Sequence, residues 1–238
     1  MPQPFLSIVI PTFNEEARIS GTLSRVIEYL TTQDYQWEIV VADDGSIDHT
    51  IRLVGLEIAA HSNIRILHLP HRGKGWAVKN GMLAAKGEYR VISDADLSVP
   101  IEQVDRLLPP LCPDVDIVLG SRETPTSSRI GEPSGRHFMG RAFNRLVALL
   151  VAPGLADTQC GFKCFSAEAA QDLFPRLTLD GFAFDVELVH LARKRGLSYS
   201  EVGVDWYYQT ESKVRPLQDA LAMMLDLLKI RWRHRDSH

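Results

Sequence analysis

The chain has 238 residues, which suffices for one large domain or for one domain with a modest appendage. A net charge of −4 and a pI near 6.1 argue against wholesale nucleic-acid binding, which requires a basic face. Three cysteines without paired spacing form neither a disulfide framework nor a closed zinc site, so we expect a reducing, cytosolic compartment.

The first half of the chain alternates short apolar runs with stretches of helical spacing. The apolar runs predict strands at residues 6–10, 37–42, 64–69, 89–93 and 116–119. The stretches between them predict helices at residues 16–30, 49–60, 74–85 and 101–108. The strand runs are rich in β-branched residues and nearly continuous, as in strands covered on both faces. This alternation indicates right-handed βαβ units and therefore an α/β fold, a mostly parallel twisted sheet flanked by helices.

The pattern changes after residue 120. Residues 123–136 are polar and rich in Ser, Thr, Pro and Gly, which predicts a mobile loop. Helices are predicted at 141–151 and 185–195, on either side of a turn region that contains glycine and cysteine, and an extended segment at 199–208. Residues 217–232 place leucines, methionines and Trp232 on one helical face, and arginines follow.

We therefore expect a main domain over residues 1–215, with halves 1–122 and 123–215, and a C-terminal amphipathic helix with a basic tail over 216–238. Neither a signal peptide nor a bilayer-spanning run of about 20 apolar residues is evident. Any membrane contact should be peripheral.

A polar or glycine-containing segment follows each predicted strand. In chain order these segments are residues 11–15 (PTFNE), 43–46 (DDGS), 72–75 (RGKG), 94–96 (DAD) and 120–122 (GSR). Open parallel sheets bind ligands beyond the carboxyl ends of their strands, which meet at one edge. We therefore expect the five segments to contribute to one site.

Asp94 and Asp96 are separated by a single residue. Two carboxylates so close repel each other unless a cation lies between them or one is protonated. Mg²⁺ or Mn²⁺ with oxygen ligands meets this need and leaves positions for substrate phosphates. Such an ion would neutralise charge on a departing diphosphate. The alternative is that both residues only cap the following helix or form a solvated turn.

The other strand ends suggest a phosphate-bearing nucleotide. Asp44 is predicted to contact a nucleoside, while Asp43 is predicted to serve a local Asx turn. Gly73 and Lys74 open a helix, where backbone amides approach phosphate closely. A dinucleotide-dependent dehydrogenase would also be doubly wound, but it requires a glycine-rich turn after the first strand. Residues 11–15 contain no glycine, which disfavours that alternative.

In order and spacing, these segments resemble the inverting family 2 glycosyltransferases, which have a GT-A fold. The matching segments are residues 10–15, 41–46, 73–75, 94–97 and 120–122, over about the first half of the chain. In the second half, residues 157–163, 184–187, Trp206 and 212–214 resemble dolichyl-phosphate β-glucosyltransferases and their prokaryotic relatives. Ser98 stands where related mannosyltransferases typically have Gln, which favours glucose and a UDP donor over mannose and GDP.

The resemblance implies a nucleotide-sugar half over 1–122 and an acceptor half over 123–215. The nucleotide-sugar site would comprise Pro11, Phe13, Glu15, Asp43, Asp44, Gly73, Lys74 and Asp94. Asp94 and Asp96 would hold the metal and the diphosphate. The acceptor phosphate would face Arg122 and Lys213, which we count with the two aspartates as catalytic, and Gly161 and Phe162 would shape the acceptor side. Pro11, Glu15, Phe162 and Lys213 each also have a purely structural interpretation.

The implied activity is transfer of glucose from UDP-glucose to a dolichyl or polyprenyl phosphate, with inversion. A phosphate monoester is already ionised near pH 7, so this acceptor needs alignment and cations rather than a general base. Three alternatives remain open: a GDP-mannose-dependent mannosyltransferase, a soluble enzyme with a sugar acceptor, and a silent nucleotide-binding module. The lipid acceptor implies a peripheral protein at the cytoplasmic face of a membrane. Its C-terminal helix would lie on lipid, on its own domain or on a second copy in a homodimer.

Overall fold

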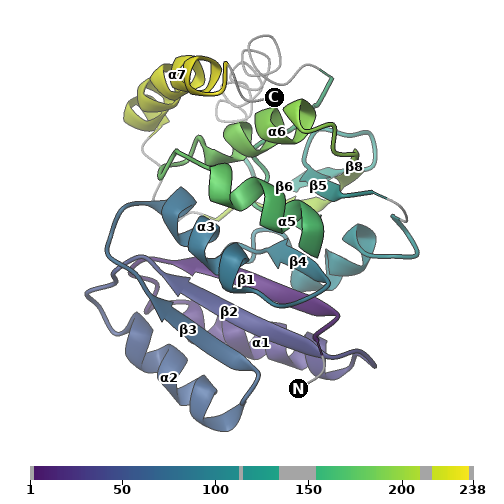
Figure 1. The fold of residues 1–238 in the computed structure, drawn as a ribbon. Helices are drawn as coiled ribbons and strands as arrows, with labels where there is room; N and C mark the ends of the chain where they lie inside the picture. Colours follow the sequence, from purple (N-terminus) through teal and green to yellow (C-terminus); the bar gives the residue numbers. More distant parts are fainter. Residues whose placement is uncertain (1–2, 113–114, 134–153, 210–215, 236–238) are drawn as a thin grey trace.

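The computed structural model describes residues 3–112, 115–133, 154–209 and 216–235, with side chains from residue 223 onward in the last segment (Figure 1). A seven-stranded sheet lies at the centre, in the order β3-β2-β1-β4-β7-β5-β8. Its strands are β1 (Leu6–Thr12), β2 (Trp37–Asp43), β3 (Ile64–His68), β4 (Tyr89–Ile92), β5 (Ile117–Ser121), β7 (Lys163–Ser166) and β8 (Tyr199–Gly203). Strand β7 is antiparallel to both neighbours, and the other pairs are parallel. The predicted mostly parallel α/β sheet is confirmed.

Helices cover both faces of the sheet (Figure 1). One face carries α1 (Ile19–Thr31), α2 (Thr50–Ala60) and the 3-10 helix η1 (Ile101–Leu107). The other carries α3 (Lys74–Ala84), α5 (Ala167–Leu173), η2 (Phe174–Arg176), α6 (Phe184–Lys194) and α7 (Pro216–Arg233). The four helices predicted in the first half occur close to their expected bounds. The fourth is a 3-10 helix rather than an α-helix, because prolines before and after it confine it to a short segment.

The burial pattern explains these elements. Helix α1 has a single apolar stripe at helical spacing that faces the sheet, formed by Ile19, Leu23, Val26, Ile27 and Leu30. In β1, by contrast, the consecutive residues Val9 and Ile10 are both fully buried and belong to the core clusters on opposite faces. The central strands have continuous apolar runs because helices cover both faces of the sheet and bury the side chains on both faces of such a strand.

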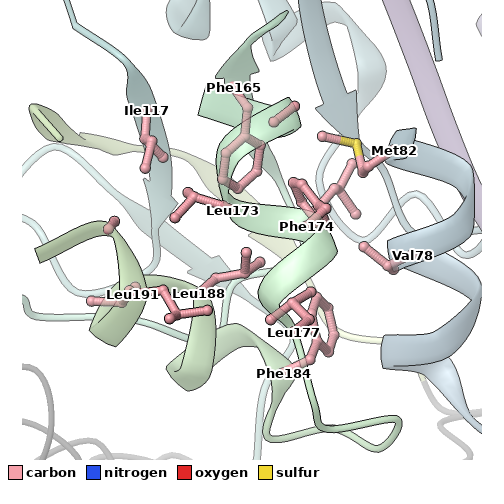
Figure 2. Packing of buried hydrophobic residues seen from close by; sticks show 14 of the residues in the cluster. Val78, Met82, Ile117, Phe165, Leu173, Phe174, Leu177, Phe184, Leu188 and Leu191 are labelled. Atoms are coloured by element: carbon pink, nitrogen blue, oxygen red, sulfur yellow. The ribbon is translucent and has the colours of Figure 1, made fainter. Parts of the chain in front are cut away.

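The core beneath α3 joins distant parts of the chain (Figure 2). Phe165 of β7 and Phe174 of η2 meet edge to face, with ring centroids 5.1 Å apart. Val78 and Met82 of α3 belong to the same cluster. Full burial of a side chain of this size contributes about 1.5–3 kcal/mol. The helix that begins at Lys74 is thus held in place by residues from the second half of the chain.

Strand β7 and helix α5 lie where the sequence pattern predicts only a turn region. Lys163 begins β7 yet is fully buried, with its Nζ 2.6 Å from Asp185 Oδ1 on α6. A lysine at a buried strand position interrupts the hydrophobic pattern that would reveal the strand. Helix α5 has seven residues, too few to show periodicity, although Ser166 caps it by accepting a hydrogen bond from the Ala169 amide.

A second, two-stranded parallel sheet pairs β6 (Ser128–Ile130) with β9 (Asp205–Tyr207). The predicted mobile loop at 123–136 is therefore wrong for residues 128–130, because their backbone pairs with β9. Residues 134–136 and the predicted helix at 141–151 lie outside the described residues. The extended segment predicted at 199–208 is present as β8 and β9.

The predicted C-terminal amphipathic helix is present as α7, beside α6 (Figure 1). Leu227 and Ile230 are buried in the core cluster that includes α6. Leu225, Leu228 and Trp232 on another face of α7 are 61%, 62% and 77% exposed. The helix therefore packs on its own domain and also presents apolar side chains outward. Within the described residues, the structure contains no helix with both the length and the apolar character needed to cross a bilayer.

Candidate active site

A cavity of about 660 Å³ opens where β1, β2 and β4 end. Eight of the residues predicted from sequence line it: Pro11, Phe13, Glu15, Asp44, Gly73, Lys74, Asp94 and Asp96. They come from four separate segments of the first half of the chain. The structure therefore brings four of the five predicted segments together at one cavity.

The charged centre of the cavity comprises Asp94, Asp96 and Lys74. Lys74 Nζ lies 2.7 Å from Asp94 Oδ1. Burial by itself lowers the pKa of Lys74, but the carboxylates of Asp94, Asp185 and Asp96 outweigh that effect and raise it above the usual value. Lys74 is therefore a firmly protonated cation beside the carboxylates at the end of β4.

The backbone around Asp94 is shaped for this arrangement. A Cβ atom on Gly161 would overlap the carboxylate of Asp94, so only glycine allows the two segments to approach this closely. Gly161 was predicted to shape the acceptor side, and the structure places it directly against the predicted metal ligand. Asp96 is held by its own turn, since its Oδ1 accepts a hydrogen bond from the Ser98 amide at 2.9 Å.

The donor atoms at this point fit a hard divalent cation. Two carboxylates line one wall of the cavity, and Lys74 shows that the place beside Asp94 accepts positive charge. Within the described residues, no cluster of three or more His, Cys, Asp and Glu side chains surrounds a metal position. Mg²⁺ and Mn²⁺ commonly bind through one or two carboxylates and complete their coordination with substrate phosphates and water. The residues present suit that mode of binding.

Asp43 and Asp44 have different roles. Asp43 closes a turn, as the sequence pattern predicts, and Asp44 lines the cavity. Asp43 is fully buried and its Oδ2 accepts hydrogen bonds from the amides of Gly45 and Ser46, which closes the turn after β2. Asp43 does not line the cavity. Asp44 does, and its carboxylate accepts hydrogen bonds from the amides of Arg72 and Gly73 at 2.9 and 2.8 Å. Asp44 thereby fixes the loop that leads into Lys74.

The sequence pattern does not predict five of the residues that line the cavity: Arg18, His71, Ala77, Gly181 and Phe182. His71 stacks on Phe13 with ring centroids 4.0 Å apart and an interplanar angle of 13°, and its Nδ1 lies 2.7 Å from Asp44 Oδ2. Gly181 and Phe182 reach the cavity from the second half of the chain. A lone histidine in a loop carries no motif, and no local pattern places residues 181–182 opposite β1. Only the position of His71 beside residues 72–75 offered a signal.

Two of the predicted acceptor-side residues, Arg122 and Phe162, do not line this cavity. Arg122 is 19% exposed and donates from Nε and Nη2 to Asp157 at 2.6 and 2.9 Å. Burial opposes the charge of Asp157, but Arg122 more than compensates and holds the pKa of Asp157 well below its usual range. Phe162 is 2% exposed and belongs to the core. Lys213 and residues 212–214 lie outside the described residues.

The Arg122–Asp157 pair adjoins Trp206, the tryptophan singled out in the sequence. The guanidinium carbons of Arg122 and Arg129 lie 5.7 and 5.8 Å from the centroid of its ring. Arg129 in turn pairs with Glu123 and Glu132. This cluster joins the end of β5 to β6 and β9, and it forms a second polar centre whose residues do not line the cavity.

Comparison with known proteins gives matches that extend beyond the first half of the chain. The family model of glycosyl transferase family 2 matches residues 7–174. The dolichyl-phosphate beta-glucosyltransferase of Dictyostelium discoideum is 35% identical over 244 aligned positions, which cover 97% of this chain and 75% of that protein. The human protein of the same name is 33% identical, over 98% of this chain and 76% of that protein.

Solved structures with the same fold include glucosyl-3-phosphoglycerate synthase from Mycobacterium tuberculosis. Its complex with UDP superposes with a TM-score of 0.69 at 22% identity, covering 95% of this chain and 80% of that chain. Its complex with Mn²⁺, UDP and glucosyl-3-phosphoglycerate gives a TM-score of 0.69 at 23% identity, over 95% and 78% of the two chains. At this level of identity the likeness concerns the fold, and it confirms the GT-A architecture expected from the sequence.

Proposed function

The chain belongs to glycosyl transferase family 2, and on this premise we propose that it transfers glucose from UDP-glucose to a dolichyl or polyprenyl phosphate. The observation that carries the proposal is the charged centre of the cavity, in which Asp94, Asp96 and Lys74 lie together. The relatives' names supply the acceptor and the sugar. A site that combines two carboxylates with a protonated lysine suits a nucleoside diphosphate and a divalent cation.

In this proposal Asp94 and Asp96 hold Mg²⁺ or Mn²⁺, which supplies Lewis-acid stabilisation of a departing diphosphate when bound. Lys74 contributes a second positive charge from the first turn of α3, where the helix dipole also favours an anion. Phe13 and His71 offer a flat, partly exposed surface for the base, and Asp44 keeps the loop of His71 in position. Pro11 and Glu15 complete the nucleoside side.

The acceptor phosphate attacks the anomeric carbon from the face opposite UDP, which inverts the configuration. Its oxygen is ionised near pH 7, so the protein needs to align two anions rather than remove a proton. We assign this task to Arg122 and Lys213. Asp157 accepts hydrogen bonds from Nε and Nη2 of Arg122, which fixes the plane of the guanidinium. We propose that the rest of the guanidinium meets the incoming anion.

The hydrocarbon tail of the acceptor requires a membrane surface. We propose that the exposed face of α7, with Leu225, Leu228 and Trp232, lies on the lipid as a peripheral contact at the cytoplasmic face. Lys229 and Arg231 are charged and exposed on the same helix, and they suit anionic head groups. Alternatively, the same face of a second copy of the chain covers it in a homodimer. Co-sedimentation with liposomes distinguishes lipid binding from dimer formation.

The test is direct. The protein is incubated with labelled UDP-glucose, GDP-mannose and other nucleotide sugars, each with Mg²⁺ or Mn²⁺ and a short polyprenyl phosphate, and the lipid fraction is counted. We expect labelled lipid from UDP-glucose, and none after chelation of the metal. Label from GDP-mannose alone would identify the mannosyltransferase instead. Transfer only to free sugars would identify the soluble enzyme, and binding of UDP without transfer the silent module.

A further inference from the structure

Residues 177–182 connect η2 with α6 and reach the cavity at their end; we call them the wall segment. Gly181 and Phe182 of the wall segment line the cavity. We propose that His234, acting through Glu187, positions the wall segment for binding of the donor diphosphate. His234 and Glu187 do not line the cavity themselves, so they act as positioning residues. The inference rests on the proposed function only in taking the ligand of the cavity to be a nucleoside diphosphate.

Glu187 connects His234 with the wall segment through hydrogen bonds. It lies in the first turn of α6 and is fully buried. Its Oε1 accepts a hydrogen bond from Thr178 Oγ1 at 2.6 Å, and its Oε2 accepts from the amides of Thr178 and Leu179 at 3.0 and 2.9 Å. His234 Nε2 lies 2.6 Å from Oε1. A buried carboxylate is costly unless donors surround it, so loss of His234 weakens the set that holds the wall segment.

The chain around His234 is anchored at the same place. Arg233 Nη1 donates to Thr178 O and Oγ1 at 3.2 and 3.0 Å. Lys194 Nζ, at the end of α6, donates to the backbone oxygens of His234 and Arg235. Hence the residues at the end of α7 contact both α6 and the beginning of the wall segment, and His234 cannot shift without disturbing both.

The wall segment in turn supports the loop that carries Lys74. Asp180 O accepts a hydrogen bond from the Trp76 amide at 3.2 Å, and the Asp180 carboxylate pairs with Arg72 at 2.6 Å. A Cβ on Gly73 would lie 2.5 Å from Asp180 O, and one on Gly75 2.6 Å from Leu179 O. Both neighbours of Lys74 therefore rest directly on the wall segment. A shift of that segment displaces Lys74 from Asp94 and from a bound diphosphate.

This chain of contacts gives a specific expectation. The dissociation constant of UDP, measured by calorimetry with Mn²⁺ and without lipid, should rise at least about fivefold in His234→Ala, the lower end of couplings between distant sites. His234→Gln should restore most of the affinity, because its amide N–H group occupies the place of Nε2. Arg233→Ala should weaken UDP binding in the same direction. The matched control is Arg52→Ala, which changes an exposed arginine on α2.

Two further readouts separate positioning from a general loss of stability. In His234→Ala, KM for UDP-glucose should rise while kcat changes little. Hydrogen exchange of the amides in residues 178–182 should quicken in His234→Ala and not in Arg52→Ala. If His234→Ala does not fold, Arg233→Ala carries the same test, with weaker UDP binding and faster exchange required together.

The outcomes are distinct. Equal UDP affinity in the wild type, His234→Ala and Arg233→Ala would overturn this inference and leave the proposed function intact. Weaker binding with unchanged exchange in residues 178–182 would also overturn it, because the wall segment would not be the intermediary. A wild-type protein that binds no UDP would overturn the proposed function, and this inference with it.

Discussion

The part of the sheet formed by β1 to β4 and the part formed by β5, β7 and β8 bring polar residues together in different ways. In the first, consecutive parallel strands deliver Asp44, Asp94 and Asp96 to one cavity, each within a few residues of a strand end. In the second, polar residues meet as buried pairs from distant positions, as in Arg122–Asp157 and Lys163–Asp185. Parallel topology thus turns short sequence motifs into a site, whereas an antiparallel insertion hides its chemistry from the sequence.

This contrast predicts that loss of a carboxylate from the first part chiefly lowers activity, whereas loss of a carboxylate from the second part chiefly lowers stability. In the first part, Asp96→Asn removes a charge at the cavity without emptying space. We expect glucosyl transfer to fall about 10²–10³-fold, the usual loss when one stabiliser of developing charge is removed. The melting temperature should stay near that of the wild type. Glu28→Gln, on the exposed face of α1, serves as the control. Retained transfer in Asp96→Asn would remove this carboxylate from the reaction.

In the second part, Asp157→Asn leaves Arg122 without its buried counter-ion. We expect the free energy of unfolding to drop by up to about 3 kcal/mol, the lower end of the usual loss for a broken buried pair, because the Arg122 side chain left unpaired is still 19% exposed. The double variant Arg122→Met with Asp157→Leu should recover much of that loss, since it removes both charges. Urea unfolding of the three proteins measures this difference. A fully stable Asp157→Asn would show that the pair contributes little to the fold.

Gly161 links the two parts and sharpens the comparison. Gly161→Ala places a methyl group against the carboxylate of Asp94. We expect Mn²⁺ affinity in the presence of UDP to fall about 10–100-fold, the usual effect of disturbing a neighbour of a metal ligand. Gly21→Ala on α1, where an added Cβ meets nothing within 4 Å, is the matched control. Unchanged metal affinity in Gly161→Ala would place the cation away from Asp94.

The smallest expected effect is on the pH dependence of stability. The pKa of Asp157 is depressed by Arg122, so the stabilisation is present above the unfolded value of about 3.9 and is lost as the pH falls toward the folded value. Between about pH 4 and pH 2 the wild type should lose more stability than the double variant that lacks both charges. An equal loss of stability on acidification in the wild type and in the double variant would contradict the assignment of this pH dependence to Asp157.

The sequence alone predicts most of the first part. The strands, the helices and eight cavity residues follow from continuous apolar runs and from the polar segments that end them. This succeeds because parallel strands share one carboxyl edge, so position along each strand already determines position in space. Residues 43–46 show the limit of such a prediction. Asp43 lies in the turn and Asp44 lines the cavity, and the sequence pattern alone does not separate the two carboxylates with certainty of place.

The rest required three-dimensional contacts. Lys163 obscures β7 in the sequence, because a buried lysine is acceptable in a strand only with partners such as Asp185 and the Cys160 carbonyl. Arg122 carries a recognisable motif, yet nothing in the sequence reveals that Asp157 occupies its guanidinium. The wall segment and His71 enter the cavity through packing and stacking, which leave no periodic signal. Charge pairs formed across the fold are therefore what the sequence pattern misses.

The most direct measurement of the central claim is the mutual dependence of UDP and Mn²⁺ binding, followed by calorimetry in the wild type, Asp94→Asn and Asp96→Asn. If the two carboxylates hold a cation that in turn binds the diphosphate, Mn²⁺ should tighten UDP binding in the wild type and have little effect in either variant. The same UDP affinity with and without Mn²⁺ in the wild type would contradict the account.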